Sequence, residues 1–345
     1  MKKVSLSKIA QVTGVSIGTV SRVLNGKAAQ CRICKSTVEK VMAASRSLNY
    51  SPVHIEKNLS IKKNHLIGLV IPSLKNQYFA DIASVVISET EKYGYSVMIF
   101  DSMEDEQVFR KAVSTLVEKK VDGMILVPCG DDSLWLEQID KTLIPIVLVD
   151  RYYEDTTLSY VTTNNFKGGV IAVNRLVESG HRDIACIQGV SSMPNKERVQ
   201  GYISGMVAAG LQDHIKVIGN DFTIQNGYLS TKLLLSEDGG SKCPTAIFTL
   251  SNTIMLGSLT AIREAGLKVP RDISLISFDN YMYLDYMDPP ITRVDQPISD
   301  ICTLAVITLV EKIDRLRSAE TKILLVPKII EGKSVAMCPD ILSLK

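Results

Sequence analysis

The sequence contains no uninterrupted apolar stretch of eighteen residues, and Met1-Lys2-Lys3 is not followed by an apolar signal core. The first absence argues against a membrane-spanning helix and the second against a secretion signal. The seven cysteines are odd in number and scattered, which suits reduced thiols better than a framework of disulfides. We therefore expect a cytoplasmic protein without a membrane partner.

Signatures of enzymes on α/β folds are also missing. The chain has neither the phosphate-binding pattern G-x-x-x-x-G-K-[ST] nor the dinucleotide pattern G-x-G-x-x-G, and it has no nucleophile elbow. Trp135 and the four histidines are isolated, so a structural role is favoured for each. The sequence therefore predicts no enzyme activity, no catalytic residue and no cofactor.

Cys31-Arg32-Ile33-Cys34 has the C-x-x-C spacing, which can form half of a zinc site or a redox pair. Arg32 and Lys35 would lower the pKa of such thiols. No second C-x-x-C and no paired histidine follows in the N-terminal region. The interpretation that we prefer is two partly buried small residues in a loop, and hence no metal site.

Acidic residues are nearly absent from the N-terminal region. Residues 1–63 contain Glu39 and Glu56 against twelve lysines and arginines, a net charge of +10, whereas the whole chain of 345 residues has +2. The remainder therefore carries −8. A basic end on a nearly neutral chain is typical of a module that binds nucleic-acid phosphates, joined to a second module.

The basic region contains a helix-turn-helix pattern. Apolar side chains recur at helical spacing in residues 7–12 and 15–25, and Gly14 and Ser16 supply the turn and the N-terminal cap between them. Residues 35–48 predict a third helix that packs on the first two. A pair of helices in an ordinary globular core would show the same spacing, but the position and the basic surroundings favour DNA binding.

The outer face of the second helix is expected to be small, polar and cationic. Gly18 lets the backbone approach a DNA groove, and Arg22 can donate two hydrogen bonds to a guanine edge. The other members of this face are Ser16, Thr19, Ser21 and Asn25.

Residues 53–60 form a short segment in which Ile55 and Leu59 lie four positions apart. The segment is too short to be a stable helix alone. A hinge that folds when something holds it and a plain interdomain linker both fit this composition. The expected domains are a headpiece at 1–52, a hinge or linker at 53–63, and a larger domain at 64–345.

From residue 66 onward, continuous apolar runs alternate with helical patterns. Such runs are typical of parallel strands that helices cover on both faces, so we predict an α/β domain with doubly wound parallel sheets. The expected strands are residues 66–71, 96–100, 123–127, 146–149, 160–163, 184–188, 246–250 and 274–278.

Polar residues follow these strands at their carboxyl ends, where ligands of parallel sheets bind. Tyr78, Phe79 and Phe222 add aromatic rings nearby, a mixture that suits sugars and nucleobases. The polar residues are Pro72-Ser73, Asp101-Ser102, Pro128, Asp150-Arg151, Asn164-Asn165, Ser251-Asn252 and Asp279-Asn280.

Specific motifs extend over nearly the whole chain, at residues 15–26, 48–52, 67–72, 121–126, 179–185, 269–274 and 278–280. With these motifs the chain resembles the lactose-repressor/galactose-repressor (LacI/GalR) family of bacterial transcription regulators. The resemblance implies an all-α DNA headpiece, a hinge helix, and a two-lobed effector domain similar to periplasmic sugar-binding proteins. The chain would cross between the lobes near residues 163, 292 and 325.

The resemblance also implies roles for individual residues. Ile17, Gly18 and Arg22 would read the major groove, and Leu59 would wedge into the minor groove. The expected phosphate contacts are Ser5, Ser16, Thr19, Ser21 and Asn25. The expected effector contacts are Tyr78, Phe79, Asp150, Arg198, Phe222 and Asp279, with Asp150 and Arg198 on one side of the cleft and Asp279 on the other.

Some positions depart from the family pattern. Glu56 stands where a small alanine is usual, and an acidic side chain is repelled by the minor groove. Ser251-Asn252 replaces the common Asn-Asp pair, and Asn164-Asn165 replaces Asp-Asn. The loss of two carboxylates leaves the ligand open among sugars, sugar phosphates and nucleosides.

The sequence thus predicts a regulator, most simply a repressor, that binds a near-palindromic DNA operator as a homodimer under the control of a small molecule. The alternatives are an enzyme on a doubly wound sheet, which would show the missing signatures, and a solute-binding protein. A solute-binding protein for a transporter would need an export signal and would lack the basic headpiece.

Overall fold

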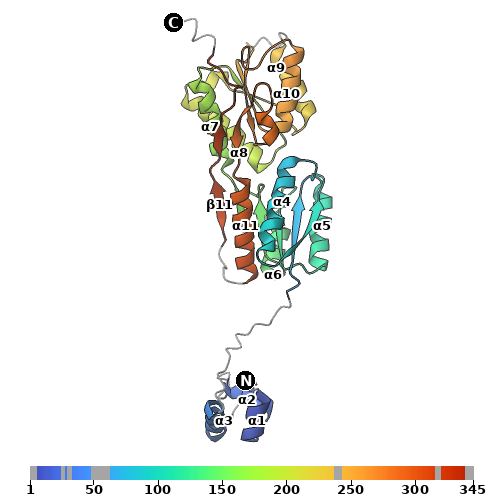
Figure 1. Cartoon of the computed structure of the whole chain (residues 1–345), viewed down its shortest axis with the longest axis vertical. Coiled ribbons are helices and arrows are strands. Elements are labelled where there is room, and N and C mark those ends of the chain that lie inside the picture. The colour runs from blue at the N-terminus through green and yellow to red at the C-terminus, as the bar shows by residue number, and fades with distance from the viewer. Residues whose placement is uncertain are drawn as a thin grey trace. The chain divides into compact units, whose positions relative to one another are not determined.

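The computed structural model describes residues 6–24, 28, 33–47, 63–236, 243–314 and 320–338 (Figure 1). Contacts divide the chain into two units, Met1–Lys63 and Asn64–Lys345, which are called here the headpiece and the α/β domain. Within the described ranges, no helix has the length and the apolar character needed to cross a membrane.

Three helices form the headpiece: α1 (Leu6–Thr13), α2 (Ile17–Leu24) and α3 (Lys35–Ser47). Each helix contributes one completely buried aliphatic side chain, Ile9, Val20 or Val41, to a common core. The apolar spacing of the sequence therefore faces inward, as expected for short helices that tertiary packing stabilises.

The turn between α1 and α2 contains the residues that the sequence singled out. Gly14 adopts a left-handed backbone with φ of +70°, which glycine tolerates at the end of a helix. The Oγ atom of Ser16 accepts a hydrogen bond from the backbone N–H of Thr19 at 3.1 Å and so caps α2. The predicted helix-turn-helix is confirmed.

The α/β domain contains two six-stranded sheets, each with helices on both faces, which we call lobe 1 and lobe 2. In lobe 1 the strand order is β11-β5-β4-β3-β1-β2. Helices α4 (Gln77–Glu91) and α11 (Ile298–Ile313) cover one face, and α5 (Glu106–Glu118) and α6 (Leu134–Thr142) cover the other. The strands are β1 (Leu66–Ile71), β2 (Ser96–Asp101), β3 (Gly123–Leu126), β4 (Ile146–Val149), β5 (Ser159–Thr163) and β11 (Lys322–Leu325).

In lobe 2 the strand order is β12-β10-β9-β8-β6-β7. Helices α7 (Asn165–Glu178) and α8 (Met193–Ala208) pack on one face, and α9 (Ile224–Leu235) and α10 (Asn252–Glu264) on the other. Two short 3₁₀ helices, η1 (Gln212–His214) and η3 (Met282–Asp285), lie in loops. The strands are β6 (Ile184–Ile187), β7 (Lys216–Ile218), β8 (Ala246–Thr249), β9 (Ser274–Phe278), β10 (Thr292–Asp295) and β12 (Lys328–Ile330).

The predicted doubly wound parallel architecture is confirmed, with one exception among the described strands. Strand β12 runs antiparallel to β10, with Arg293 opposite Ile330. The sequence also missed four short strands, β7, β10, β11 and β12.

The chain passes between the lobes three times. It leaves lobe 1 after Thr163, where β5 ends, and it returns to lobe 2 between β11 and β12. The second crossing lies at Gln296-Pro297, between β10 and α11, rather than near Thr292-Arg293 as expected. The expectation was wrong because Thr292 and Arg293 pair with β9 inside the sheet of lobe 2.

Candidate functional site

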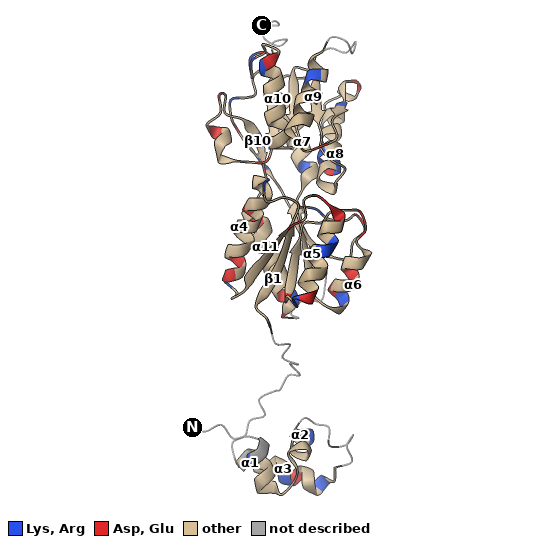
Figure 2. Cartoon of the chain, turned by 90° about the vertical axis from the view of Figure 1, so that its right-hand side faces the viewer, with Lys and Arg blue, Asp and Glu red and all other residues tan. Residues whose placement is uncertain are grey.

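The outer face of α2 is the candidate DNA-contacting surface of the headpiece. Ile17 is 53% exposed although it is a large aliphatic residue, and Ser16, Gly18 and Arg22 are also exposed. The hydroxyls of Ser16 and Thr19 lie 2.9 Å apart. Lysines and arginines of the headpiece helices are visible in Figure 2. This face combines hydrogen-bond donors, positive charge and one apolar side chain, as direct readout of DNA requires.

Other expected DNA contacts lie outside the part of the headpiece that the structure describes. They are Ser5, Asn25 and Leu59, together with the hinge segment and Glu56, and the side chain of Ser21 is likewise not described. Their roles remain predictions.

Cys34 lies exposed just before α3, with its Sγ atom 3.3 Å from Ser36 Oγ and 3.0 Å from Thr37 Oγ1. These hydrogen bonds lower the pKa of the Cys34 thiol to about 7. The expectation of a partly buried residue is wrong for Cys34, whose side chain is exposed. Cys31 lies outside the described residues, so the absence of a zinc or redox role for the C-x-x-C pair stays a prediction. No group of three metal-ligating side chains occurs within the ranges that the structure describes.

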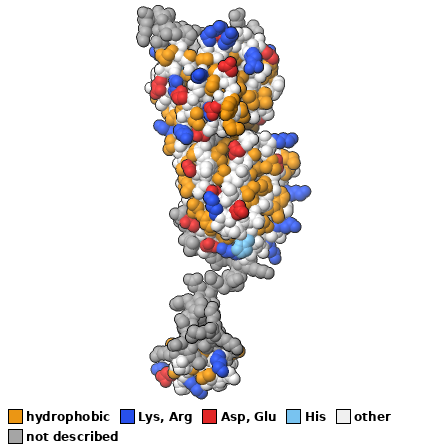
Figure 3. Space-filling view, in the orientation of Figure 1, with side chains coloured by type: hydrophobic (Ala, Val, Ile, Leu, Met, Phe, Trp, Pro, Cys, Tyr) orange, Lys and Arg blue, Asp and Glu red, His pale blue; other side chains and the backbone are white. Residues whose placement is uncertain are grey.

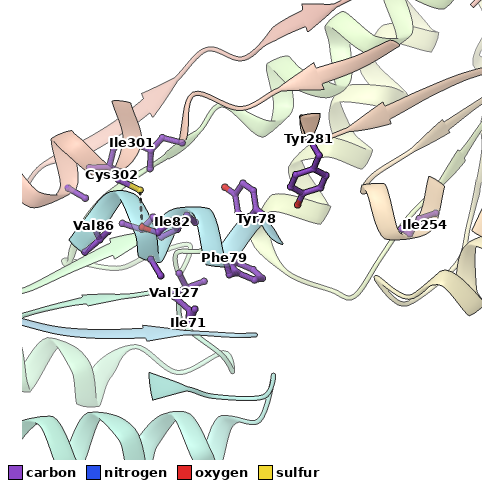
Figure 4. Packing of buried hydrophobic residues seen from close by; sticks show 14 of the residues in the cluster. Ile71, Tyr78, Phe79, Ile82, Val86, Val127, Ile254, Tyr281, Ile301 and Cys302 are labelled. Carbon is purple, nitrogen blue, oxygen red and sulfur yellow. Dashed lines mark hydrogen bonds between the residues drawn. The ribbon is translucent and has the colours of Figure 1, made fainter. Parts of the chain in front are cut away.

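The α/β domain has a polar cavity of about 60 Å³ between the two lobes. The carboxyl ends of parallel strands from both sheets meet there, which is where the sequence placed its polar residues. Figure 4 shows Tyr78 and Phe79 on the first turn of α4, with Tyr281 of lobe 2 nearby. The cavity, which we call the cleft, is lined by Asn76, Tyr78, Phe79, Glu104, Asp150, Arg151, Ser192, Pro194, Arg198, Phe222, Ser251, Asp279 and Gln296.

The wall from lobe 1 is built by the start of α4 and the end of β4. Asn76 caps α4 by accepting a hydrogen bond from the backbone N–H of Tyr78 at 3.1 Å. The Tyr78 hydroxyl donates a hydrogen bond to Asp150 Oδ1 at 2.9 Å. Asp150 has a left-handed backbone with φ of +63°, an uncommon conformation that clusters at ligand sites.

The wall from lobe 2 is built around Arg198 of α8. Its Nε donates to Asn165 Oδ1 at 2.8 Å, and its Nη1 donates to the carbonyl oxygen of Leu250 at 2.9 Å. The guanidinium carbon lies 3.7 Å from the centre of the Phe278 ring, a cation–π contact. Arg198 is therefore held rigidly before any ligand arrives.

Gln296, in the second crossing, joins the two walls. Its Oε1 accepts a hydrogen bond from Thr163 Oγ1 at 2.6 Å and lies 3.3 Å from the hydroxyl of Tyr78. Its Nε2 donates to Asp279 Oδ1 at 2.6 Å. Asp150, Tyr78, Gln296 and Asp279 thus form a buried polar chain from one lobe to the other.

Burial raises the pKa of both carboxyl groups at the ends of this chain. For Asp150, Arg151 and Arg198 partly oppose the effect of burial, and for Asp279, Arg198 and the hydrogen bond from Gln296 do so. Buried carboxyl groups of this kind gain from partners that donate hydrogen bonds. Sugar hydroxyls are such donors, and Phe79 and Phe222 add rings that can cover the apolar face of a sugar.

The six residues expected at the effector site, Tyr78, Phe79, Asp150, Arg198, Phe222 and Asp279, all line the cleft. Their expected arrangement needs one correction. Arg198 does not share a wall with Asp150, because α8 follows β6 in lobe 2 and places Arg198 with Asp279. Asp150 lies on the wall from lobe 1.

At the two places in the α/β domain where the sequence departs from the family pattern, the first residue of each pair, Ser251 or Asn164, caps a helix. Ser251 lines the cleft and accepts a hydrogen bond from the backbone N–H of Ile254 at 3.3 Å, at the start of α10. Asn164 accepts from the N–H of Lys167 at 2.9 Å, at the start of α7.

Sequence reasoning missed several residues of the cleft. Arg151 and Ser251 appeared among the polar strand ends but were not chosen, whereas Gln296 follows a strand that the sequence did not reveal. A capping pattern could have identified Asn76, which directly precedes α4. No local signal marks Glu104, Ser192 or Pro194 as cleft residues.

Comparisons with known proteins agree with this architecture. The family model "Bacterial regulatory proteins, lacI family" matches residues 5–53, and the model "Periplasmic binding protein-like domain" matches residues 173–335. The HTH-type transcriptional repressor PurR of Actinobacillus pleuropneumoniae serotype 3 is 32% identical over 338 residues, which cover 96% of this chain and 98% of the relative. The ribose operon repressor of Haemophilus influenzae is 29% identical over 335 residues, covering 96% and 98%.

Among solved structures, the lac repressor dimer bound to operator and the anti-inducer ONPF superposes with a TM-score of 0.72 at 27% identity. The match covers 97% of this chain and 100% of that one. Three observations lead to one conclusion: the headpiece has a helix-turn-helix, the α/β domain has two lobes with a polar cleft, and the relatives are similar over almost their full length. The chain belongs to the lacI family of bacterial regulatory proteins, which are DNA-binding transcriptional repressors with an effector-binding domain.

Proposed function

We propose that this repressor binds a near-palindromic operator as a homodimer, and that a small neutral sugar in the cleft controls its affinity for that operator. The observation that carries the proposal is the meeting of six predicted ligand-binding side chains from both lobes in one cavity, in a chain that also has a helix-turn-helix. The site of action is chromosomal DNA, which places the protein in the bacterial cytoplasm.

Two features of the cleft favour a sugar as its ligand. Asp150 and Asp279 offer hydrogen-bond acceptors on opposite walls of the cleft, while Phe79 and Phe222 supply apolar faces. The relative named ribose operon repressor supports a pentose as the first compound to test.

Control by the ligand follows from its position between the lobes. A compound that bonds to Asp150 on one wall and to Arg198 and Asp279 on the other favours one angle between the lobes. In a dimer this angle sets the separation of the two hinges, and hence whether Leu59 of each chain reaches the minor groove. A coupling of about 1 to 3 kcal/mol is typical, so the sugar should change operator affinity by about 5- to 150-fold.

The homodimer is supported by the solved relatives, and the α/β domain has exposed apolar side chains that an interface could use. Large apolar side chains are exposed on elements of both lobes, among them Ile87 of α4, Leu233 of α9 and Met282 of η3. Figure 3 shows hydrophobic side chains spread over both lobes on the face in view. The lac repressor, to which the chain is similar over almost its full length, was solved as a dimer and supports the same state here.

The proposal is tested by selecting operator sequences from random DNA with the purified full-length protein. Retention of the selected DNA is then measured with and without a panel of pentoses and hexoses. Arg22→Ala should cost about 1 to 3 kcal/mol on the selected operator and relax the preference at one base pair.

Lys40→Ala is the matched control, because it removes the same charge from the exposed surface of α3. This variant should weaken the binding of operator and random DNA alike. Equal losses on both DNAs for Arg22→Ala would show that Arg22 touches phosphate alone. Failure to select any sequence would refute the proposed function.

A further inference from the structure

Arg151 faces the cleft from lobe 1, but another residue of that lobe already engages its charge. Nη1 of Arg151 donates to Glu104 Oε2 at 2.7 Å, and Nη2 donates to Oε1 at 2.8 Å. This is a bidentate pair, the strongest arrangement of these two side chains. The Arg151 side chain is 12% exposed and that of Glu104 is 48% exposed, so Glu104 closes off the guanidinium from the solvent side.

The loop that presents Glu104 is held in a costly conformation. Met103 and Glu104 have φ of +53° and +58°, two consecutive left-handed residues that are not glycine. The carboxylate of Asp101 secures the loop by accepting hydrogen bonds from the N–H of Met103 at 2.8 Å and of Leu74 at 2.9 Å. The backbone N–H of Glu104 donates to the carbonyl oxygen of Pro72 at 3.1 Å. The position of the Glu104 backbone is thus imposed by the surrounding loops, and its carboxylate is held by the pair with Arg151.

Neutralisation of Arg151 alters what the cleft can hold. The charged groups that line it are Glu104, Arg151, Asp150, Arg198 and Asp279. Two arginines in a cleft are typical of phosphate recognition, because guanidinium groups bind phosphate oxygens in pairs. Glu104 engages one N–H of each Nη atom of Arg151, the parallel pair with which a guanidinium binds phosphate oxygens, and its negative charge repels an anion at the same place.

We infer that Glu104 is the charge filter of the cleft: it holds and neutralises Arg151, so that the cleft accepts neutral polyhydroxy compounds and rejects their phosphate esters. Glu104 therefore acts as a positioning residue, through Arg151. The inference deepens the proposed function and rests on the cleft being the effector site.

The test uses inorganic phosphate and ribose 5-phosphate as ligands of the full-length protein. The melting temperature is measured against ligand concentration, with sodium chloride at matched ionic strength as the reference, because a ligand that binds the folded protein raises the melting temperature. The variant Glu104→Gln keeps the shape of the side chain and removes its charge. It should be half-saturated by either anion at a concentration at least about tenfold lower than wild type.

Two variants separate charge in the cleft from charge in general. Glu106→Gln breaks a similar pair, since Glu106 lies 2.8 Å from Arg110 on the surface of the same lobe and outside the cleft. It should respond to phosphate as wild type does. Glu104→Gln combined with Arg151→Gln should lose the gain, because the guanidinium is then absent.

Equal responses of Glu104→Gln and Glu106→Gln would overturn the inference, as would a double variant that keeps the gain. Tight binding of ribose 5-phosphate by the wild type would do the same. If Glu104→Gln proves unstable, Glu104→Asp is measured instead. This variant retains the charge and should still exclude phosphate, so tighter phosphate binding by Glu104→Asp than by the wild type would contradict a role for charge. Operator selection by the wild type is measured separately, so its failure would refute the proposed function without changing the phosphate comparison.

Discussion

The close approach of α7 and α8 allows a sharp test of how the cleft is built. A Cβ atom added at Gly201 of α8 would lie 2.1 Å from the carbonyl oxygen of Phe166 on α7. Non-bonded carbon and oxygen atoms are comfortable at about 3.5 Å, so Gly201→Ala must push the two helices apart by more than about 1 Å. Arg198 lies one turn before Gly201 and donates to Asn165 Oδ1, at the start of α7, so the same shift loosens the lobe 2 wall of the cleft.

The expected cost follows from two opposing effects. Overpacking of a close contact costs about 1 to 3 kcal/mol, and the upper end applies because a backbone carbonyl cannot rotate away. Alanine within a helix gains about 1 kcal/mol over glycine. Gly201→Ala should therefore lower the free energy of unfolding by about 2 kcal/mol, measured by urea denaturation of the full-length protein.

Gly205→Ala is the matched comparison on the same helix. Its added Cβ would lie 2.9 Å from Cβ of Val173, a milder clash with a side chain rather than with the backbone. The loss should be about 1 kcal/mol or less after the gain in helix propensity. If Gly201→Ala unfolds at the same urea concentration as wild type, or if Gly205→Ala is the more damaging change, then this contact does not set the distance between α7 and α8.

Two further predictions concern pH. Asp279→Asn keeps an oxygen that accepts from Gln296 and removes a carboxylate whose pKa burial raises. The folded wild type holds this proton to higher pH than the unfolded chain does, so its stability falls as pH rises from the unfolded to the folded pKa of Asp279. The variant should therefore be more stable than the wild type at neutral pH and should lose this advantage on acidification. It should also lose the sugar response in operator titrations. His181 is buried between Thr245 Oγ1 and the carbonyl oxygen of Ala336, each 3.0 Å away, and burial lowers its pKa. On acidification the unfolded chain binds a proton at His181 at a higher pH than the folded chain does, so the stability of the wild type should fall as pH drops below about 6.5. His181→Gln should reduce this dependence of stability on pH, measured by urea denaturation. An unchanged slope would show that another group controls it.

The local sequence pattern was sufficient to predict the strands that consist of a continuous, buried apolar run. The strands β1, β3, β4, β8 and β9 were predicted within a residue or two because both of their faces are buried in the sheets. The missed strands are short and carry charged residues, such as Arg293 and Asp295 in β10 and Lys328 in β12. Their pairing with neighbouring strands, rather than their own composition, makes them strands.

Many of the residues that line the cleft were predictable because parallel strands bring their carboxyl ends to one edge of a sheet. Which lobe each of these residues belongs to was not predictable from chain order. Arg198 was expected beside Asp150, but the first crossing between the lobes, after Thr163, places it in lobe 2.

The sequence by itself determined the division into a basic headpiece and an α/β domain, the helix-turn-helix, and the ring of polar strand ends. Each of these depends on periodicity or charge within a few tens of residues. The tertiary structure decided how the polar groups are paired: Tyr78 meets Gln296 across 218 positions of the chain, and Glu104 neutralises Arg151 across 47. No local pattern specifies such pairs, because the distance between their atoms is set by the crossings between the lobes and by strained loops.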